Sequence, residues 1–391
     1  MSVAQRVTTG GTPGDQNDDD DISDVYPDDR QWVDTRIQLI REKLQPLKTP
    51  VQRIPLPPKL AGLELHIKKE SEQPSGSHKH RLAEALLTNA LASGQLTAKT
   101  PAIEASSGST AVSEAWYCQQ LGIEFYAVVP ESTSKEKLEL IKQYGGTPVP
   151  VKGDIVAQAQ ALAVTKKGYF LDQFTYAERA YDWRGEHGLA PELLGAVPEL
   201  DWFVMGAGTG GTATSVGRYA RYAQTRLRVC VTDPDHSAYF RGWRDDDRTV
   251  KDQGSRIEGI GRPEVEPSFL FPMVNRMIQV HDAASVATMR VAADAGWGIK
   301  AGPSTGTGLF GAIRILLTMQ ESGRSGKVAT LMCDSADRYQ KEYYDDAWLK
   351  EKGIDYKPWV PTIEEFFKTG GWHPPVDVEP TPRPATVLWN M

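Results

Sequence analysis

The stretch DWFVMGAGTGGT, residues 201–212, predicts a buried strand that runs through a glycine-rich turn directly into a helix. Glycines in such a turn let backbone N–H groups close on an anion, and the start of the following helix adds positive potential. A phosphate group is therefore the natural ligand of residues 206–212.

The same alternation of strand and helix extends over most of the chain on both sides of this unit. Strands are expected at residues 63–70, 123–130, 169–174, 201–206, 227–234 and 327–335. Helices are expected between a capping Asp34 and Pro46, at 80–94, 133–146, 157–167 and 283–296, and after Gly211 and Thr307. Thr133 and Glu136 form a capping box for one of them. Because the strands are rich in Val and Ile, the pattern predicts an α/β fold of parallel sheets covered by helices.

Two further turns precede expected helices: SSGST, residues 106–110, and GPSTGTG, residues 302–308. In parallel α/β sheets, ligands bind beyond the carboxyl ends of the strands, where such turns lie. The hydroxyls and helix-start amides of residues 106–110 suit a carboxylate or a phosphate. Lys79, in SGSHKHR at residues 75–81, stands at the start of a helix; taken alone, it is typical of a solvated basic loop.

The turn at 206–212 allows other interpretations. Gly206, Gly208 and Gly211 spell G-x-G-x-x-G, and Asp233 ends the next expected strand, where a dinucleotide-binding fold places its ribose-binding acid. A nicotinamide dehydrogenase is therefore one hypothesis. A tight strand–helix joint with no ligand is another.

Composition narrows the class of protein. The 391 residues suffice for two packed domains, and no apolar run is long enough to span a bilayer. Residues 1–30 hold eight Asp and two Arg, so they carry most of the net charge of −7. The remainder is close to neutral, which predicts neither nucleic acid nor a membrane as partner. The polar N-terminus lacks the pattern of a signal peptide, so we expect a cytoplasmic protein.

The ends and the cysteines carry little chemistry. Residues 1–35 are predicted to form an acidic disordered tail and residues 376–391 a Pro-rich tail. Cys118, Cys230 and Cys333 are widely spaced, which indicates core positions and neither a disulfide framework nor a zinc site.

Taken together, the lysine and the three turns form a more specific pattern. A lysine after a Gly-Ser turn, then S-S-G-x-T, G-T-G-G-T and G-x-S-x-G, resembles the fold type II pyridoxal-phosphate enzymes, the cysteine synthase and cystathionine β-synthase family, whose fold is like that of tryptophan synthase β. The resemblance runs from about residue 48 to 345. EASSGSTAVSEAWY, DQFTYAERAYDWRGEH, SRIEGIGRPEVEPSF and CDSADRYQKEYYDDAWL are most similar to the bacterial L-cysteine desulfhydrase branch.

The resemblance implies a role for each motif. Lys79 would form the Schiff base with pyridoxal 5'-phosphate and then take the substrate Cα proton, since a lysine amine loses its charge readily when partly buried. The implied phosphate cradle is Gly208, Thr209, Gly210, Gly211 and Thr212. Ser109 would bind the ring oxygen of the cofactor and Ser304 its pyridine nitrogen. The implied substrate-carboxylate site is Ser106, which starts its loop, with Ser107, Gly108, Thr110 and Gln173.

Three positions depart from the wider family. Ser109 stands where relatives usually have Asn, His80 where they usually have Asp, and Gly308 where they often have Asn. The first two departures are shared with the desulfhydrase-like branch. His78 and His80 flank Lys79, but H-x-H is a poor metal signal without further ligands, so no metal is expected.

The function that follows is β-elimination on L-cysteine or a related β-substituted amino acid, through an aminoacrylate, giving sulfide, pyruvate and ammonia. β-Replacement on the same scaffold is the alternative; a dehydrogenase and a binding protein on a non-catalytic scaffold are further hypotheses. We expect a large cofactor-binding domain of residues 36–72 and 176–375, a smaller mobile domain of residues 73–175, and, by family precedent, a homodimer.

Overall fold

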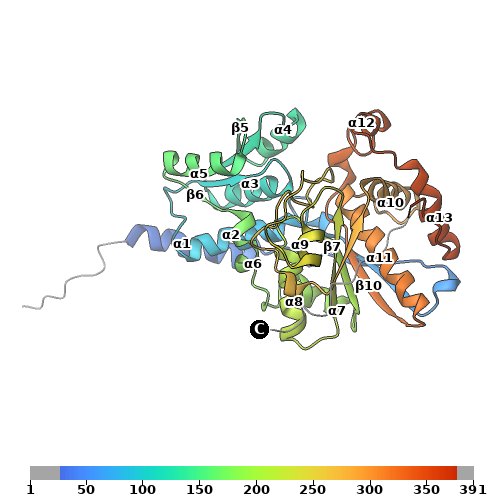
Figure 1. Ribbon diagram of the computed structural model, residues 1–391. Coiled ribbons are helices and arrows are strands. Elements are labelled where there is room, and N and C mark those ends of the chain that lie inside the picture. The colour runs from blue at the N-terminus through green and yellow to red at the C-terminus, as the bar shows by residue number, and fades with distance from the viewer. Residues whose placement is uncertain (1–26, 377–391) are drawn as a thin grey trace, which may run out of the picture.

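The computed structural model describes residues 27–376, which contain two β-sheets surrounded by helices (Figure 1). The larger sheet has six strands in the order β1–β2–β10–β7–β8–β9. Their bounds are β1 Val51–Ile54, β2 Leu63–Lys68, β7 Trp202–Gly206, β8 Arg228–Pro234, β9 Arg276–Val280 and β10 Gly326–Leu331. All neighbours are parallel except β1, an edge strand antiparallel to β2.

Two sets of helices cover the faces of the larger sheet. One hydrophobic core joins the sheet to α10, α11 and α13, and a second core joins the opposite face to α7, α8 and α9. Successive residues of β7 show the division, because Val204 belongs to the first core and Phe203 and Met205 to the second. These helices are α7 Leu189–Ala196, α8 Gly211–Tyr222, α9 Tyr239–Asp245, α10 Asp282–Asp294, α11 Pro303–Glu321 and α13 Val360–Thr369.

The smaller sheet has four parallel strands in the order β5–β4–β3–β6. Its strands are β3 Ala102–Ala105, β4 Phe125–Pro130, β5 Thr147–Val151 and β6 Tyr169–Phe170. The helices around it are α1 Pro27–Lys43, α2 Lys79–Ala92, α3 Ser109–Leu121, α4 Lys135–Gln143 and α5 Ile155–Lys166. Helix α6, Gln173–Ala180, contacts both α2 and α8 and so connects the two halves, and α12 is Asp346–Glu351.

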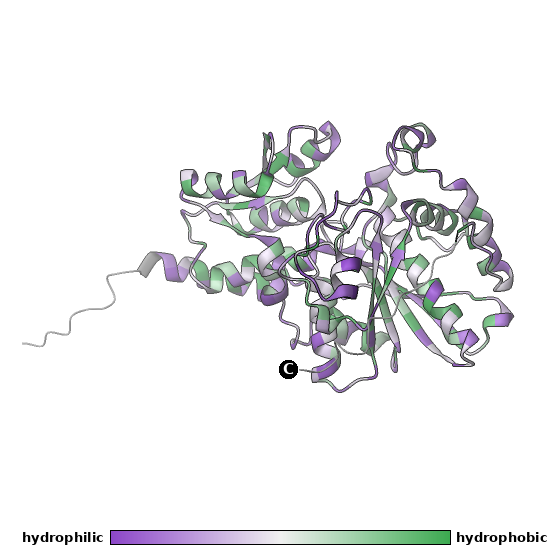
Figure 2. Cartoon of the chain, viewed as in Figure 1, coloured by the Kyte–Doolittle hydropathy of each residue, from purple (hydrophilic) through white to green (hydrophobic). Residues whose placement is uncertain are grey.

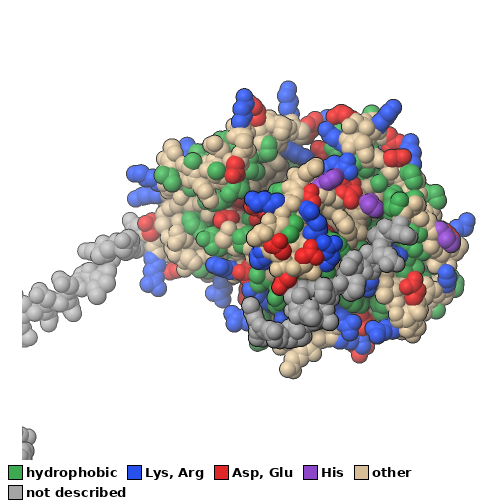
Figure 3. Space-filling view, in the orientation of Figure 1, with side chains coloured by type: hydrophobic (Ala, Val, Ile, Leu, Met, Phe, Trp, Pro, Cys, Tyr) green, Lys and Arg blue, Asp and Glu red, His purple; other side chains and the backbone are tan. Residues whose placement is uncertain are grey.

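The predicted α/β class with parallel sheets flanked by helices is confirmed, and Figure 2 shows hydrophobic residues concentrated in strands and on inward helix faces. Among the described residues, no helix is long and apolar enough to cross a bilayer. Acidic and basic side chains are interspersed on the face shown in Figure 3.

Several local predictions were wrong. Helix α1 begins at Pro27, so residues 27–35 are not part of a tail, and its Ile40 packs in the core of the smaller sheet, not in the larger domain. Residues 1–26 and 377–391 of the predicted tails lie outside the described residues. The expected strand 169–174 ends at Phe170, because Asp172 adopts a left-handed conformation and caps α6. The division of the chain into a large and a smaller mobile domain stays a prediction.

Two helix starts also differ from expectation. Ser134, not Thr133, caps α4 by accepting a hydrogen bond from the Lys137 N–H. The residues 302–308 do not precede a helix but form its first turns, since α11 begins at Pro303. A Cβ on Gly308 would lie 2.7 Å from the Thr330 hydroxyl, so glycine there lets α11 lie close against β10.

Candidate active site

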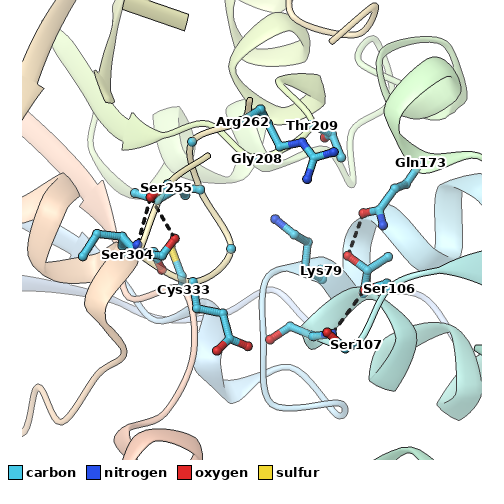
Figure 4. A pocket seen from close by; sticks show the side chains of 18 of the residues that line it. Lys79, Ser106, Ser107, Gln173, Gly208, Thr209, Ser255, Arg262, Ser304 and Cys333 are labelled. Atoms are coloured by element: carbon cyan, nitrogen blue, oxygen red, sulfur yellow. Dashed lines mark hydrogen bonds between the residues drawn. The ribbon is translucent and has the colours of Figure 1, made fainter. Parts of the chain in front are cut away.

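A cavity of about 470 Å³ lies where β3, β7 and β10 end, between the two sheets (Figure 4). Because parallel strands share one carboxyl edge, the loops that follow them converge here. Ten predicted site residues line the cavity: Lys79, Ser106, Ser107, Gly108, Ser109, Thr110, Gln173, Gly208, Thr209 and Ser304. Gly210, Gly211 and Thr212 do not line it.

Lys79 is the first residue of α2 and is 9% exposed. Its Nζ lies 3.2 Å from His78 Nε2 and points into the cavity (Figure 4). Burial lowers the pKa of Lys79, and the neighbouring Cys333 and Asp334 only partly oppose this shift. A lysine with a lowered pKa supplies more of the neutral amine that nucleophilic attack and proton removal require.

The turn after β7 approaches this lysine closely. A Cβ on Gly208 would lie 2.4 Å from the Gly259 carbonyl oxygen and 3.5 Å from Lys79 Nζ, so a glycine is required. The Gly208 carbonyl accepts a hydrogen bond of 2.6 Å from the Tyr239 hydroxyl, which fixes the turn. Thr209 is buried, and its hydroxyl accepts the Gly211 N–H at 3.2 Å.

The remaining predicted cradle residues serve packing in this structure. Gly210 has φ +85°, and a Cβ on it would lie 2.5 Å from Phe269 Cα. A Cβ on Gly211 would lie 2.6 Å from Ala177. The Thr212 hydroxyl lies 3.5 Å from that of Tyr181. Their predicted contact with phosphate stays a prediction.

The loop between β3 and α3 supplies the hydroxyl side of the cavity. Gly108 precedes α3 without a side-chain cap, which leaves helix-start N–H groups available to an anion. Thr110 donates a 2.8 Å hydrogen bond to Gln173 Oε1. Buried Glu104 accepts the Gln173 N–H at 3.1 Å and so ties this loop to the start of α6.

Ser109 and Ser304 have partners of their own. The Ser109 hydroxyl accepts a hydrogen bond of 2.6 Å from Arg338 Nη1 and donates one of 3.4 Å to Asp334 Oδ2. Ser304 hydrogen-bonds the Cys333 thiol, whose pKa burial raises to about 12. Cys333 therefore stays a neutral thiol. All three cysteines are buried as predicted, but Cys333 also lines the cavity.

Sequence reasoning missed several cavity residues. Asp334 follows β10, and its carboxylate accepts a 2.7 Å hydrogen bond from the Tyr339 hydroxyl. Burial raises the pKa of Asp334. Its position at the end of an expected strand was a usable signal. Lys137, Glu258 and Arg262 lie in or beside loops that only the fold brings to the cavity.

Of the two histidines beside Lys79, His80 is buried and His78 is partly buried. His80 Nδ1 lies 3.0 Å from Ser75 Oγ, and its ring packs 4.8 Å and 4.5 Å from the rings of Trp116 and Tyr117. Burial, aided by the charge of Arg81, lowers the pKa of His80 to about 3. Within residues 27–376 no three metal-ligating side chains gather, and the absence of a metal stays an expectation.

This burial predicts an acid-sensitive contribution to stability. His80 binds a proton in the unfolded chain near pH 6.5 but in the folded chain only near pH 3, so the free energy of unfolding falls as the pH drops below 6.5. Between pH 7 and 5, wild type should lose about 2 kcal/mol more than His80→Gln. Urea unfolding at both pH values measures the difference. Buried acids such as Glu104, whose pKa burial raises to about 8, act with the opposite sign but are common to both proteins. Equal pH dependence would contradict the account.

These features would suit a phosphate-bearing carbonyl cofactor: a buried lysine of lowered pKa, a turn in which a Cβ on Gly208 would clash, and hydroxyls at a helix start. Residues 43–334 match the family model described as pyridoxal-phosphate dependent enzyme, and the chain belongs to that family. It is 43% identical over 355 residues to L-cysteine desulfhydrase Cds1 of Mycobacterium tuberculosis (strain ATCC 25177 / H37Ra), covering 88% of this chain and 96% of that protein.

More distant relatives have other names. Identity to cysteine synthase 2 of Schizosaccharomyces pombe is 27% over 338 residues, which cover 78% of this chain and 83% of that one. The crystal structure of O-ureido-L-serine synthase matches with a TM-score of 0.67 and 26% identity, covering 78% of this chain and 96% of that one. Membership of the fold type II pyridoxal-phosphate enzymes, and with it the cofactor, is confirmed.

The dehydrogenase hypothesis was wrong. Asp233 is fully buried at the end of β8 and accepts the Phe240 N–H at 2.7 Å, so it faces a helix start and not a ligand. Gly206 packs against Ile260.

Proposed function

We propose that this protein is a pyridoxal-phosphate-dependent lyase that removes the β-substituent of L-cysteine and yields sulfide, pyruvate and ammonia. The observation that carries the proposal is the 43% identity to L-cysteine desulfhydrase Cds1, which spans nearly the whole of that relative. The buried Lys79 beside the Gly208 turn supplies the chemistry that this reaction needs.

Different residues of the cavity are proposed to transfer the proton and to bind the substrate carboxylate. When bound, pyridoxal phosphate withdraws electrons from the substrate Cα and so makes its proton acidic. Lys79 holds the cofactor covalently and, once released, takes the Cα proton on Nζ; its lowered pKa increases the fraction of neutral amine that can do so. The helix start at Ser109, with Ser106, Ser107, Gly108, Thr110 and Gln173, holds the substrate carboxylate.

The other predicted contacts are proposed on the same basis. Gly208 to Thr212 bind the phosphate, and Ser304 faces the pyridine nitrogen. The partners of Ser109 support a modified role: Arg338 and Asp334 hold its hydroxyl, so it orients the substrate loop as well as facing the cofactor ring. We further propose that residues 73–175 close over the substrate, that the enzyme is a homodimer, and that it acts in the cytoplasm.

β-Replacement is the second candidate. Its support is the likeness to cysteine synthase 2 and O-ureido-L-serine synthase, both named for synthesis. These proteins are less similar to this chain than the desulfhydrase, so elimination is the better supported reaction.

The products formed from L-cysteine alone test the proposal. We expect equimolar sulfide and pyruvate without any second nucleophile, because water and imine hydrolysis complete the reaction once the β-substituent has left. Sulfide and pyruvate are measured together in the same incubation, and a parallel incubation contains O-acetyl-L-serine with a thiol. A new amino acid in the second incubation with no pyruvate in the first would reassign the enzyme as a synthase. A holoprotein inactive in both would favour the binding-protein hypothesis.

A further inference from the structure

Arg262 is a cation of the cavity to which no role has been given. It lies in the segment between α9 and β9, and Figure 4 shows its side chain entering the cavity and pointing toward Lys79. Its Nε donates a 2.6 Å hydrogen bond to the buried Glu266, and its guanidinium stacks 3.9 Å from the centre of the Phe174 ring. The side chain is 30% exposed.

The terminal nitrogens of Arg262 are available to a ligand. Within residues 27–376, neither Nη1 nor Nη2 makes a hydrogen bond, since the pairing with Glu266 uses Nε. An arginine whose stem and Nε are fixed presents its remaining donors as a preorganised fork for an anion. The fixed geometry means that little side-chain entropy is lost when the anion binds.

The other basic side chains of the cavity are His78, Lys79 and Lys137, and burial lowers the pKa of His78. Lys137 pairs with Glu258 at 2.6 Å and Glu342 at 3.1 Å. Lys79 must be neutral to act as a base. Arg262 is therefore the cation of the cavity that is available to stabilise a negative charge that develops during the reaction.

We propose that Arg262 stabilises the negative charge on the departing sulfur; this inference rests on the proposed elimination from L-cysteine. The substrate carboxylate has its own donors on the opposite side, at the start of α3, and Lys79 lies between that loop and Arg262 in the view of Figure 4. As Lys79 takes the Cα proton, the electron pair left at Cα forms the Cα–Cβ double bond. The Cβ–S bond breaks, and its electron pair leaves with sulfur as hydrosulfide, the anion that Arg262 meets.

Two substrates with different leaving groups test this role. Chloride is a far weaker base than hydrosulfide, so expulsion from β-chloro-L-alanine needs less charge stabilisation. Arg262→Gln should lower kcat/KM for L-cysteine on the order of 100-fold, as for the loss of one preorganised donor to a developing charge. It should leave kcat/KM for β-chloro-L-alanine nearly unchanged, and Arg262→Lys should recover part of the loss on L-cysteine.

Arg256→Gln is the matched control. Arg256 lies in the same loop and pairs through Nε with the buried Asp282 at 2.8 Å, but does not line the cavity. Arg256→Gln therefore also leaves a buried carboxylate unpaired, but outside the cavity. Its kcat/KM values for L-cysteine and for β-chloro-L-alanine should both stay near those of wild type. Arg262→Gln/Glu266→Gln removes that unpaired charge altogether and should keep the loss specific to L-cysteine.

Other outcomes would overturn the proposal. Equal losses on both substrates with a raised KM would assign Arg262 to the substrate carboxylate. A weaker equilibrium affinity for pyridoxal phosphate, titrated into the apoprotein, would assign it to the cofactor phosphate. No loss on either substrate would leave it without a role. Failure of the proposed elimination from L-cysteine would be seen separately. Wild-type protein would then release chloride from β-chloro-L-alanine but no sulfide from L-cysteine.

Discussion

Lys79→Ala should abolish turnover of L-cysteine, with kcat lower by on the order of 10³-fold or more, because the substitution removes the side chain proposed as both covalent anchor and base. The purified variant should also lose the yellow colour of the lysine-bound cofactor. Nζ hydrogen-bonds only to His78 within the described residues, so the fold should persist. Steady-state kinetics, absorption spectra and circular dichroism measure these three results.

Two further variants sharpen the test. Lys79→Arg keeps a long basic side chain but supplies no neutral amine, so it should be as inactive as Lys79→Ala. Lys69→Ala, in the segment that leads toward the site, should behave as wild type. If Lys79→Ala kept both colour and activity, Lys79 would have neither role.

Gly208→Ala should weaken cofactor binding on the order of 100-fold, equivalent to about two lost charge-assisted hydrogen bonds of ~1.5 kcal/mol each. Its Cβ would lie 2.4 Å from the backbone oxygen of Gly259, so the turn must shift from the position seen here. Titration of pyridoxal phosphate into the apoprotein, followed by fluorescence, gives the dissociation constant.

Gly195→Ala is the control for this variant, because a Cβ there meets no atom within 4 Å. Its affinity should equal that of wild type. A substitution at Gly210 would be less informative, since its Cβ would strike Phe269 and report on packing instead. Unchanged affinity in Gly208→Ala would show that this turn does not bind the phosphate.

The sequence predicted those parts of the fold that depend on local patterns. Apolar strands such as Phe125–Pro130 and glycine turns such as residues 206–212 were readable because strand burial and tight turns impose their own residue types. The prediction of a strand over 169–174 was wrong because an aromatic, apolar run also suits the start of a helix. Asp172 adopts a left-handed conformation and caps α6, so the strand ends before it. The prediction that α1 belongs to the larger domain was wrong because the residues it packs against are distant in sequence. Ile40 shares a hydrophobic core with Leu82, some 40 residues further along the chain.

The site was predicted through motifs and extended by the fold. Ten motif residues do meet in one cavity, since each stands beside the carboxyl end of a strand or at the start of a helix. A motif cannot say which glycine faces a ligand and which faces Phe269 or Ala177, because both demands select the same residue. Arg262 and Lys137 carried no local signal, since only tertiary contacts fix where their side chains point.

The position of the covalent link to the cofactor tests the central claim most directly. Holoprotein is reduced with borohydride, digested, and examined by mass spectrometry for a peptide that carries the phosphopyridoxyl group. The account predicts one modified peptide, which contains the stretch SGSHKHR and carries the group on Lys79. A group on any other lysine, or no modified peptide from a coloured holoprotein, would contradict it.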